Sequence, residues 1–152
     1  MIAINRILLP TDFSHCAERA LEYAMDLAKK FDAKLYVLHV LDMRVYARLK
    51  AFMCAGWSMR EIEEEGVKKL EAALPGNHEQ TVDVDVVVRQ GIPFLEILRF
   101  AGDAKIDLIV MGTHGRTGLA HVLIGSVAER VVRKAPCPVL TVPPKGRDFV
   151  MP

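Results

Sequence analysis

The sequence lacks an excess of charge of either sign. Its 152 residues carry 20 lysines and arginines against 19 aspartates and glutamates, which gives a formal net charge of +1. A protein that binds the phosphate backbone of a nucleic acid needs clustered basic residues, and a solvating tail needs a run of acidic ones. The charge balance therefore argues against nucleic-acid binding.

Cysteines and long apolar runs are also scarce. Cys16, Cys54 and Cys137 are odd in number, widely separated and without a Cys-x-x-Cys pair, which indicates reduced thiols and argues against a disulfide framework or a zinc site. No apolar run approaches the length that crosses a bilayer, and Asn5 and Arg6 interrupt the stretch that a signal peptide would need. We expect a cytoplasmic protein with no membrane association.

Short apolar runs alternate along the chain with segments of helical periodicity. The runs predict strands near residues 4–9, 34–41, 82–88, 108–111 and 138–142. The periodic segments predict helices over 14–30, 58–74, 92–101 and 126–135, and residues 42–57 form either a short helix or an ordered loop. This alternation is typical of a three-layer α/β sandwich with a parallel sheet. We expect a single domain over residues 1–144 and a C-terminal tail over 145–152.

A glycine-rich loop lies between the fourth predicted strand and the last predicted helix. Gly112, Gly115 and Gly118 follow the strand, and Gly125-Ser126 opens the helix. Glycines let a backbone approach an anion closely, and the first N–H groups of a helix attract it. The Walker loop and the dinucleotide fingerprint do not fit, because no lysine precedes the serine and the first glycines are three residues apart. The loop is either a phosphate site of another kind or a segment that only turns the chain.

The spacing Gly112-x2-Gly115-x9-Gly125-Ser126 resembles the nucleotide-binding signature of the universal stress protein family. The Pro-Thr-Asp-Phe-Ser segment at 10–14 and the Pro-Cys-Pro-Val-Leu-Thr-Val segment at 136–142 are similar to the family too, and the resemblance covers residues 2–143. It implies an adenine nucleotide alpha hydrolase-like fold with five parallel strands in the order 3-2-1-4-5. It also implies that nucleotide lies at the carboxyl ends of strands 1 and 4.

Asp12 follows the first predicted strand, at the edge where open α/β sheets bind ligands. Position alone fits an Asx-turn or helix cap as well as a carboxylate that binds ribose, adenine or magnesium, and the resemblance favours the ligand contact. The full nucleotide-contacting set that the resemblance implies is Pro10, Thr11, Asp12, Val40, Met111, Gly112, Gly115, Arg116, Gly125, Ser126 and Val127. Arg116 would either neutralise phosphate charge or remain a solvated loop cation.

The resemblance implies an ATP-binding regulatory protein of the universal stress response, with Mg²⁺ beside the ATP and an unidentified regulatory protein partner. Two alternatives stay open. One is a weak ATPase or autophosphorylating enzyme, although the sequence offers no catalytic lysine and no base aligned with a nucleophile. The other is a nucleotide-free dimeric adaptor. Because strand 138–142 would be an apolar edge, and family members pair this strand, we expect a homodimer through it. The apolar residues of 42–57 indicate either a partner surface or ordinary packing.

Overall fold

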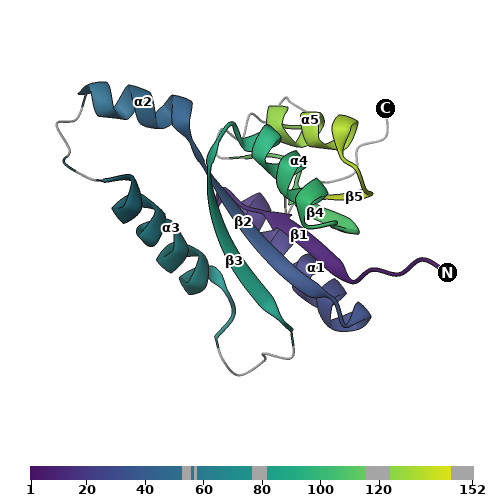
Figure 1. The fold of residues 1–152 in the computed structure, drawn as a ribbon. Helices are drawn as coiled ribbons and strands as arrows, with labels where there is room; N and C mark the ends of the chain where they lie inside the picture. The colour runs from purple at the N-terminus through teal and green to yellow at the C-terminus, as the bar shows by residue number, and fades with distance from the viewer. Residues whose placement is uncertain (53–55, 57, 77–81, 116–123, 145–152) are drawn as a thin grey trace.

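A five-stranded parallel sheet forms the centre of the fold (Figure 1). The computed structural model describes residues 1–52, 56, 58–76, 82–115 and 124–144. The strands are β1 (Arg6–Pro10), β2 (Lys34–Asp42), β3 (Val84–Gly91), β4 (Leu108–Gly112) and β5 (Val139–Val142). They lie in the order β3-β2-β1-β4-β5, and each neighbouring pair is parallel. The predicted fold class and strand order are confirmed, with β1 beside β4 in the middle and β3 and β5 at the edges.

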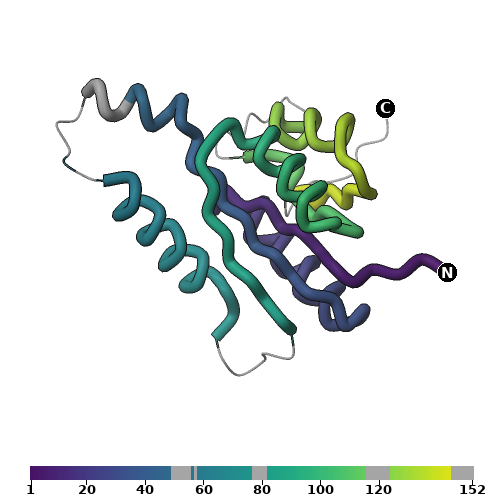
Figure 2. Tube along the Cα trace, viewed as in Figure 1, coloured from purple at the N-terminus to yellow at the C-terminus, as the bar shows by residue number. Residues whose placement is uncertain are grey.

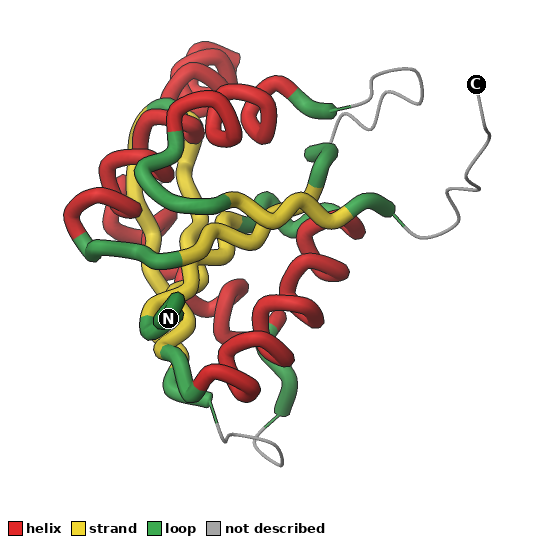
Figure 3. Tube along the Cα trace, turned by 90° about the vertical axis from the view of Figure 1, so that its right-hand side faces the viewer, coloured by secondary structure: helices red, strands yellow, loops and turns green. Residues whose placement is uncertain are grey.

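Helices cover both faces of this sheet (Figure 3). They are α1 (His15–Phe31), α2 (Met43–Phe52), α3 (Met59–Ala73), α4 (Pro93–Asp103) and α5 (Ser126–Lys134). Helices α1 and α3 pack on one face, and α4 and α5 pack on the other. Helix α2 continues directly from β2 (Figure 2), so the short helix is the correct alternative over 43–52. Residues 53–55 and 57 lie outside the described residues. No helix of the described ranges is both long and apolar enough to cross a membrane.

Local signals in the sequence begin the helices where they were expected. The Ser14 side chain caps α1 by accepting a hydrogen bond from the Ala17 N–H group. Ser58 and Glu61 form a capping box at α3, in which each side chain accepts from the other residue's backbone N–H. Pro93 occupies the first turn of α4, where its missing N–H group costs nothing.

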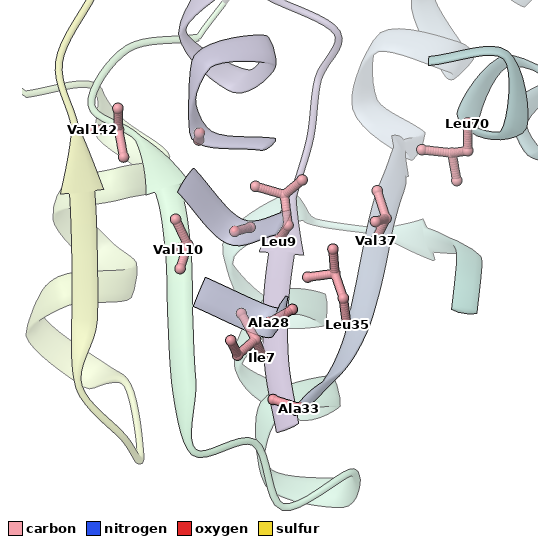
Figure 4. Packing of buried hydrophobic residues seen from close by; sticks show 11 residues of the cluster. Ile7, Leu9, Ala28, Ala33, Leu35, Val37, Leu70, Val110 and Val142 are labelled. Carbon is pink, nitrogen blue, oxygen red and sulfur yellow. The ribbon is translucent and has the colours of Figure 1, made fainter. Parts of the chain in front are cut away.

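The core has two layers, one on each face of the sheet. On the α1 and α3 face, Ala20, Ala24 and Ala28 are fully buried, and their small side chains let α1 lie close to the strands. Figure 4 shows Leu9 from β1 and Val37 from β2 on this face. The opposite layer is built from β-strand residues and from the buried faces of α4 and α5. Each face of the sheet is therefore covered, as a parallel sheet requires.

The third strand is longer at its carboxyl end than the apolar pattern predicts. It continues through Arg89 and Gln90 to Gly91, because β2 extends to Asp42 and supplies a partner at each position. Gly91 has a φ of +148°, and a Cβ there would lie 2.8 Å from Cγ of Glu96. Both observations require glycine at this turn.

Candidate functional site

The turn after β1 is held in place by hydrogen bonds at both ends. The Thr11 N–H group donates to the Leu38 carbonyl of β2 at 2.8 Å, which ties the turn to the neighbouring strand. Within the turn, Phe13 N–H donates to Thr11 Oγ1 at 3.1 Å and Ser14 N–H donates to Asp12 Oδ1 at 3.0 Å. The Asx-turn expected as one alternative for Asp12 is therefore present, with Oδ1 as its acceptor.

Phe13 gives this turn an unusual backbone and an aromatic support. Its φ of 62° lies in the left-handed region, which is uncommon for a bulky residue. Its ring lies 4.7 Å from the His39 ring, and the Lys69 ammonium of α3 lies 4.5 Å from its centroid. His39 Nδ1 is 2.9 Å from the Thr11 carbonyl oxygen, so this histidine is a hydrogen-bonded residue of the fold. Side chains from β2 and α3 thus support the strained turn.

At the end of β4, glycine is required by the close approach of α1. A Cβ on Gly112 would lie 2.8 Å from Cys16 Cβ and 2.9 Å from the Cys16 carbonyl carbon. The next residue, Thr113, is buried, and its N–H group donates to the Val142 carbonyl of β5 at 3.0 Å. The strand end is therefore clamped between α1 and β5, which fixes the start of the glycine loop.

The structure brings the two central strand ends together through Asp12 and Gly115. A Cβ on Gly115 would lie 2.7 Å from Asp12 Oδ2, so any residue other than glycine there would require the Asp12 carboxylate to move. The oxygen that is not in the Asx-turn therefore faces the glycine loop. These residues are 103 positions apart in sequence and meet because β1 and β4 are neighbours in the sheet.

Gly125 closes the loop on itself. Its N–H group donates to the Thr113 carbonyl at 2.6 Å, and a Cβ on it would lie 3.2 Å from that oxygen and 3.6 Å from the Gly115 nitrogen. The resemblance implies that Gly125 contacts nucleotide, and in the structure its N–H group donates to the Thr113 carbonyl. The role of Gly125 is to join the two arms of the loop at its base.

The N-terminus of α5 follows directly and supplies further donors. The first intrahelical bond runs from Glu129 N–H to the Gly125 carbonyl at 2.9 Å. The N–H groups of Ser126, Val127 and Ala128 come before it in the helix, at the positive end of the helix dipole. Ser126 is exposed. This terminus, together with the Gly115 backbone, has the composition of an anion site.

The remaining expected contacts lie around the same strand ends. Pro10 is buried at the end of β1, and Met111 is 5% exposed near the end of β4. Val40 is half-buried near the end of β2 and packs against the same core cluster as Met111, on the α4 and α5 face. Arg116 lies outside the described residues. Within the described ranges, no three His, Cys, Asp or Glu side chains are close enough to hold a metal ion.

The sequence did not reveal three contributors to this arrangement. Phe13 gave no signal for a left-handed backbone, because that conformation is usually filled by glycine or asparagine. Cys16 was expected to be a reduced thiol but not the contact that demands Gly112. Thr113 has a hydroxyl 2.9 Å from His114 Nδ1 and a carbonyl that accepts from Gly125 N–H, and no motif in the sequence singles it out.

Comparison with known proteins decides the family. The model of the universal stress protein family matches residues 3–143. The chain belongs to the universal stress protein family. Universal stress protein MJ0531 of Methanocaldococcus jannaschii is 40% identical over 140 residues, which cover 91% of this chain and 81% of that protein. Universal stress protein MJ0577 of the same organism is 34% identical over 159 residues, covering 95% and 98% of the two chains.

Solved structures of universal stress proteins share the fold. The structure of MJ0577 superposes with a TM-score of 0.79 at 34% identity and covers 95% of this chain and 99% of that one. A universal stress protein solved in complex with cAMP has a TM-score of 0.61 at 26% identity and covers 92% and 97%. A member of the family with the same fold therefore binds an adenine nucleotide.

Proposed function

We propose that this chain is an ATP-binding regulatory protein of the universal stress type, which holds nucleotide at the carboxyl ends of β1 and β4. The observation that carries the proposal is the meeting of Asp12 and Gly115, where a Cβ would lie 2.7 Å from the carboxylate. Open α/β sheets bind ligands where the chain leaves neighbouring strands for opposite faces. Here α1 leaves β1 for one face and α5 follows β4 on the other.

Each part of a nucleotide has a matching group at this edge. Asp12 Oδ2 would accept hydrogen bonds from ribose hydroxyls or from the adenine amine. The N–H groups of Gly115, Ser126 and Val127 would donate to phosphate oxygens, and the dipole of α5 favours that charge. Val40 and Met111 would offer an apolar surface to the base. The complex of a related universal stress protein with cAMP supports this assignment.

Mg²⁺ fits the site as a companion of the phosphates. Magnesium binds through one or two carboxylates together with phosphate oxygens and water, so a cage of three protein ligands is not needed. Asp12 is the carboxylate that would hold it. The ion would neutralise phosphate charge, while the chain's own residues bind and orient the nucleotide.

The test is nucleotide binding by a pair of glycine variants. Calorimetric titration of the purified protein with Mg-ATP should show one site per chain, and chromatography after denaturation should identify any nucleotide that copurifies. Gly115→Ala should abolish binding, because its Cβ displaces the Asp12 carboxylate. Gly102→Ala is the matched control, since nothing lies within 4 Å of a Cβ there.

The outcomes separate the alternatives. Binding that only Gly115→Ala loses supports the proposed site. Conversion of bound ATP to ADP would establish the weak enzyme, and binding without turnover would leave a binding protein. If wild-type protein binds no adenine nucleotide at millimolar concentration, the proposal is wrong and the dimeric adaptor remains.

We also propose that the protein is a cytoplasmic homodimer joined through β5, on which a regulatory partner acts. β5 is an edge strand, and Leu140 is 38% exposed on it. An exposed apolar edge favours pairing with a second copy. Leu140→Lys should convert the dimer to a monomer in light scattering, whereas Phe31→Lys, at another exposed apolar position, should not. A monomeric wild type, or a dimer that Leu140→Lys leaves intact, would contradict the pairing.

A further inference from the structure

A groove on the α1 and α3 face adjoins the turn after β1 and shares Thr11 with the proposed nucleotide site. It encloses about 490 Å³, within the range of small-molecule pockets. Leu9 of β1 and Val37 of β2 form its floor, and Leu70 of α3 lies beside them (Figure 4). Small side chains on both walls, Ala17 of α1 and Ala73 of α3, leave the space between the helices open.

Carboxylates line the α1 wall of this groove. Glu18, Glu22 and Asp26 recur every four residues on one side of the helix, so they span about 12 Å along the groove. The Glu18 carboxylate oxygen Oε2 lies 3.0 Å from His15 Nδ1. Glu22 and Asp26 make no ion pair within the described part of the chain. The wall therefore offers negative charge directly above an apolar floor.

One aromatic residue of the groove lining already has a cation of the chain beside its ring. Phe13 lines the groove, and the Lys69 ammonium lies 4.5 Å from its ring centroid. The face of an aromatic ring attracts an ammonium through its quadrupole. Both the ring and the acidic wall thus favour positive charge, and neither favours an anion.

We propose that this groove binds an amphipathic organic cation, an alkyl- or arylammonium compound. Its apolar part lies against Leu21, Met25 and Leu74, which are half-buried in the groove lining, and its ammonium lies between Glu22 and Asp26. Apolar area removed from water supplies most of the affinity, and the carboxylates supply the preference for a cation. The proposal does not depend on nucleotide binding, because the acidic wall and the apolar floor stand apart from the glycine loop and α5.

Three probes of one chain length test the charge preference. Octylammonium, octanol and octanoate, each below its micelle concentration, are titrated into the ¹⁵N-labelled protein without nucleotide and followed by amide chemical shifts. Octylammonium should bind saturably, with shifts at Leu21 and Leu70, and at least about fivefold more tightly than octanol. Octanoate should bind most weakly.

Two sets of variants locate the site. Ala73→Trp should fill the groove and abolish octylammonium binding, whereas Ala72→Trp, one position along the same helix and outside the groove lining, should not. The double variant Glu22→Gln with Asp26→Asn should bind octylammonium no better than octanol. Circular dichroism confirms that each variant is folded.

Several results would overturn the proposal. These are the absence of saturable octylammonium binding to the wild type, equal binding of the three probes, and octylammonium binding that survives Ala73→Trp. Retained cation preference in the double carboxylate variant would also overturn it, because the acidic wall would then not select the ligand.

Discussion

Replacing Gly112 by alanine tests whether the glycine at the end of β4 serves packing. The new Cβ would lie 2.8 Å from Cys16 Cβ and 2.9 Å from the Cys16 carbonyl carbon. Carbon atoms in contact are normally about 3.5–4.0 Å apart, so α1 and β4 would have to separate by nearly 1 Å. One of the atoms met is backbone, and a rotamer change cannot relieve that contact.

The expected loss of stability follows from the size of this overlap. Overpacking of a well-filled interior costs about 1–3 kcal/mol. For a domain of about 150 residues this lowers Tm by about 2–12 °C. Urea unfolding followed by circular dichroism should show a lower midpoint for Gly112→Ala at an unchanged slope.

Two further variants make the measurement specific. Gly102→Ala introduces the same methyl group into α4 with nothing within 4 Å, so it should not destabilise the protein. Cys16→Ala keeps both atoms that meet the new Cβ, so the double variant with Gly112→Ala should be no more stable than Gly112→Ala alone. A Gly112→Ala protein as stable as the wild type would refute the reasoning, and rescue by Cys16→Ala would refute the assignment of the clash.

Three other predictions concern single side chains. Asp12→Asn keeps an oxygen that can accept from Ser14 N–H, so this variant should unfold in urea near the wild-type midpoint. Asp12→Ala removes the acceptor and should lower the free energy of unfolding by about 1 kcal/mol. If Asp12→Ala has the same urea midpoint as the wild type, the hydrogen bond in the turn contributes nothing to stability. Hydrogen bonding to Arg44 lowers the pKa of Asp42, so this pair stabilises the fold above about pH 4, the unfolded pKa, and the stabilisation is lost as pH falls through the lower folded pKa. Asp42→Asn should therefore show a shallower loss of stability in acid, and identical pH profiles would contradict the assignment. Burial, with a smaller contribution from a nearby carboxylate, raises the pKa of the Cys137 thiol. Iodoacetamide should therefore label Cys137 more slowly in the folded protein than in urea at about pH 8, as measured by peptide mass spectrometry. Equal labelling rates in the two conditions would contradict the raised pKa.

Signals that act within one turn of the chain could be predicted from the sequence. The caps at Ser14 and Ser58, the proline that opens α4 and the glycine at position 91 each depend on neighbours a few residues away. The strand order came from the family resemblance, because periodicity locates strands but does not order them.

Contacts between distant elements could not be predicted. The approach of Cys16 to Gly112 and the support of Phe13 by Lys69 depend on how closely helices pack on the sheet. The same holds for Gly125, a residue expected to contact nucleotide, whose N–H group donates to the Thr113 carbonyl. Within the site, residue types could be named from sequence, but which backbone groups remain available to a ligand depends on tertiary hydrogen bonds.

The bond between Gly125 and Thr113, 2.6 Å long, has a consequence for protein engineering. It holds Thr113 and Gly125 next to each other, whatever the number of residues between them. Lengthening a flexible segment with fixed ends costs only about 0.6 kcal/mol for each doubling of its length. A short peptide tag for a fluorescent dye, inserted between residues 116 and 123, would thus leave the sheet and α5 in register.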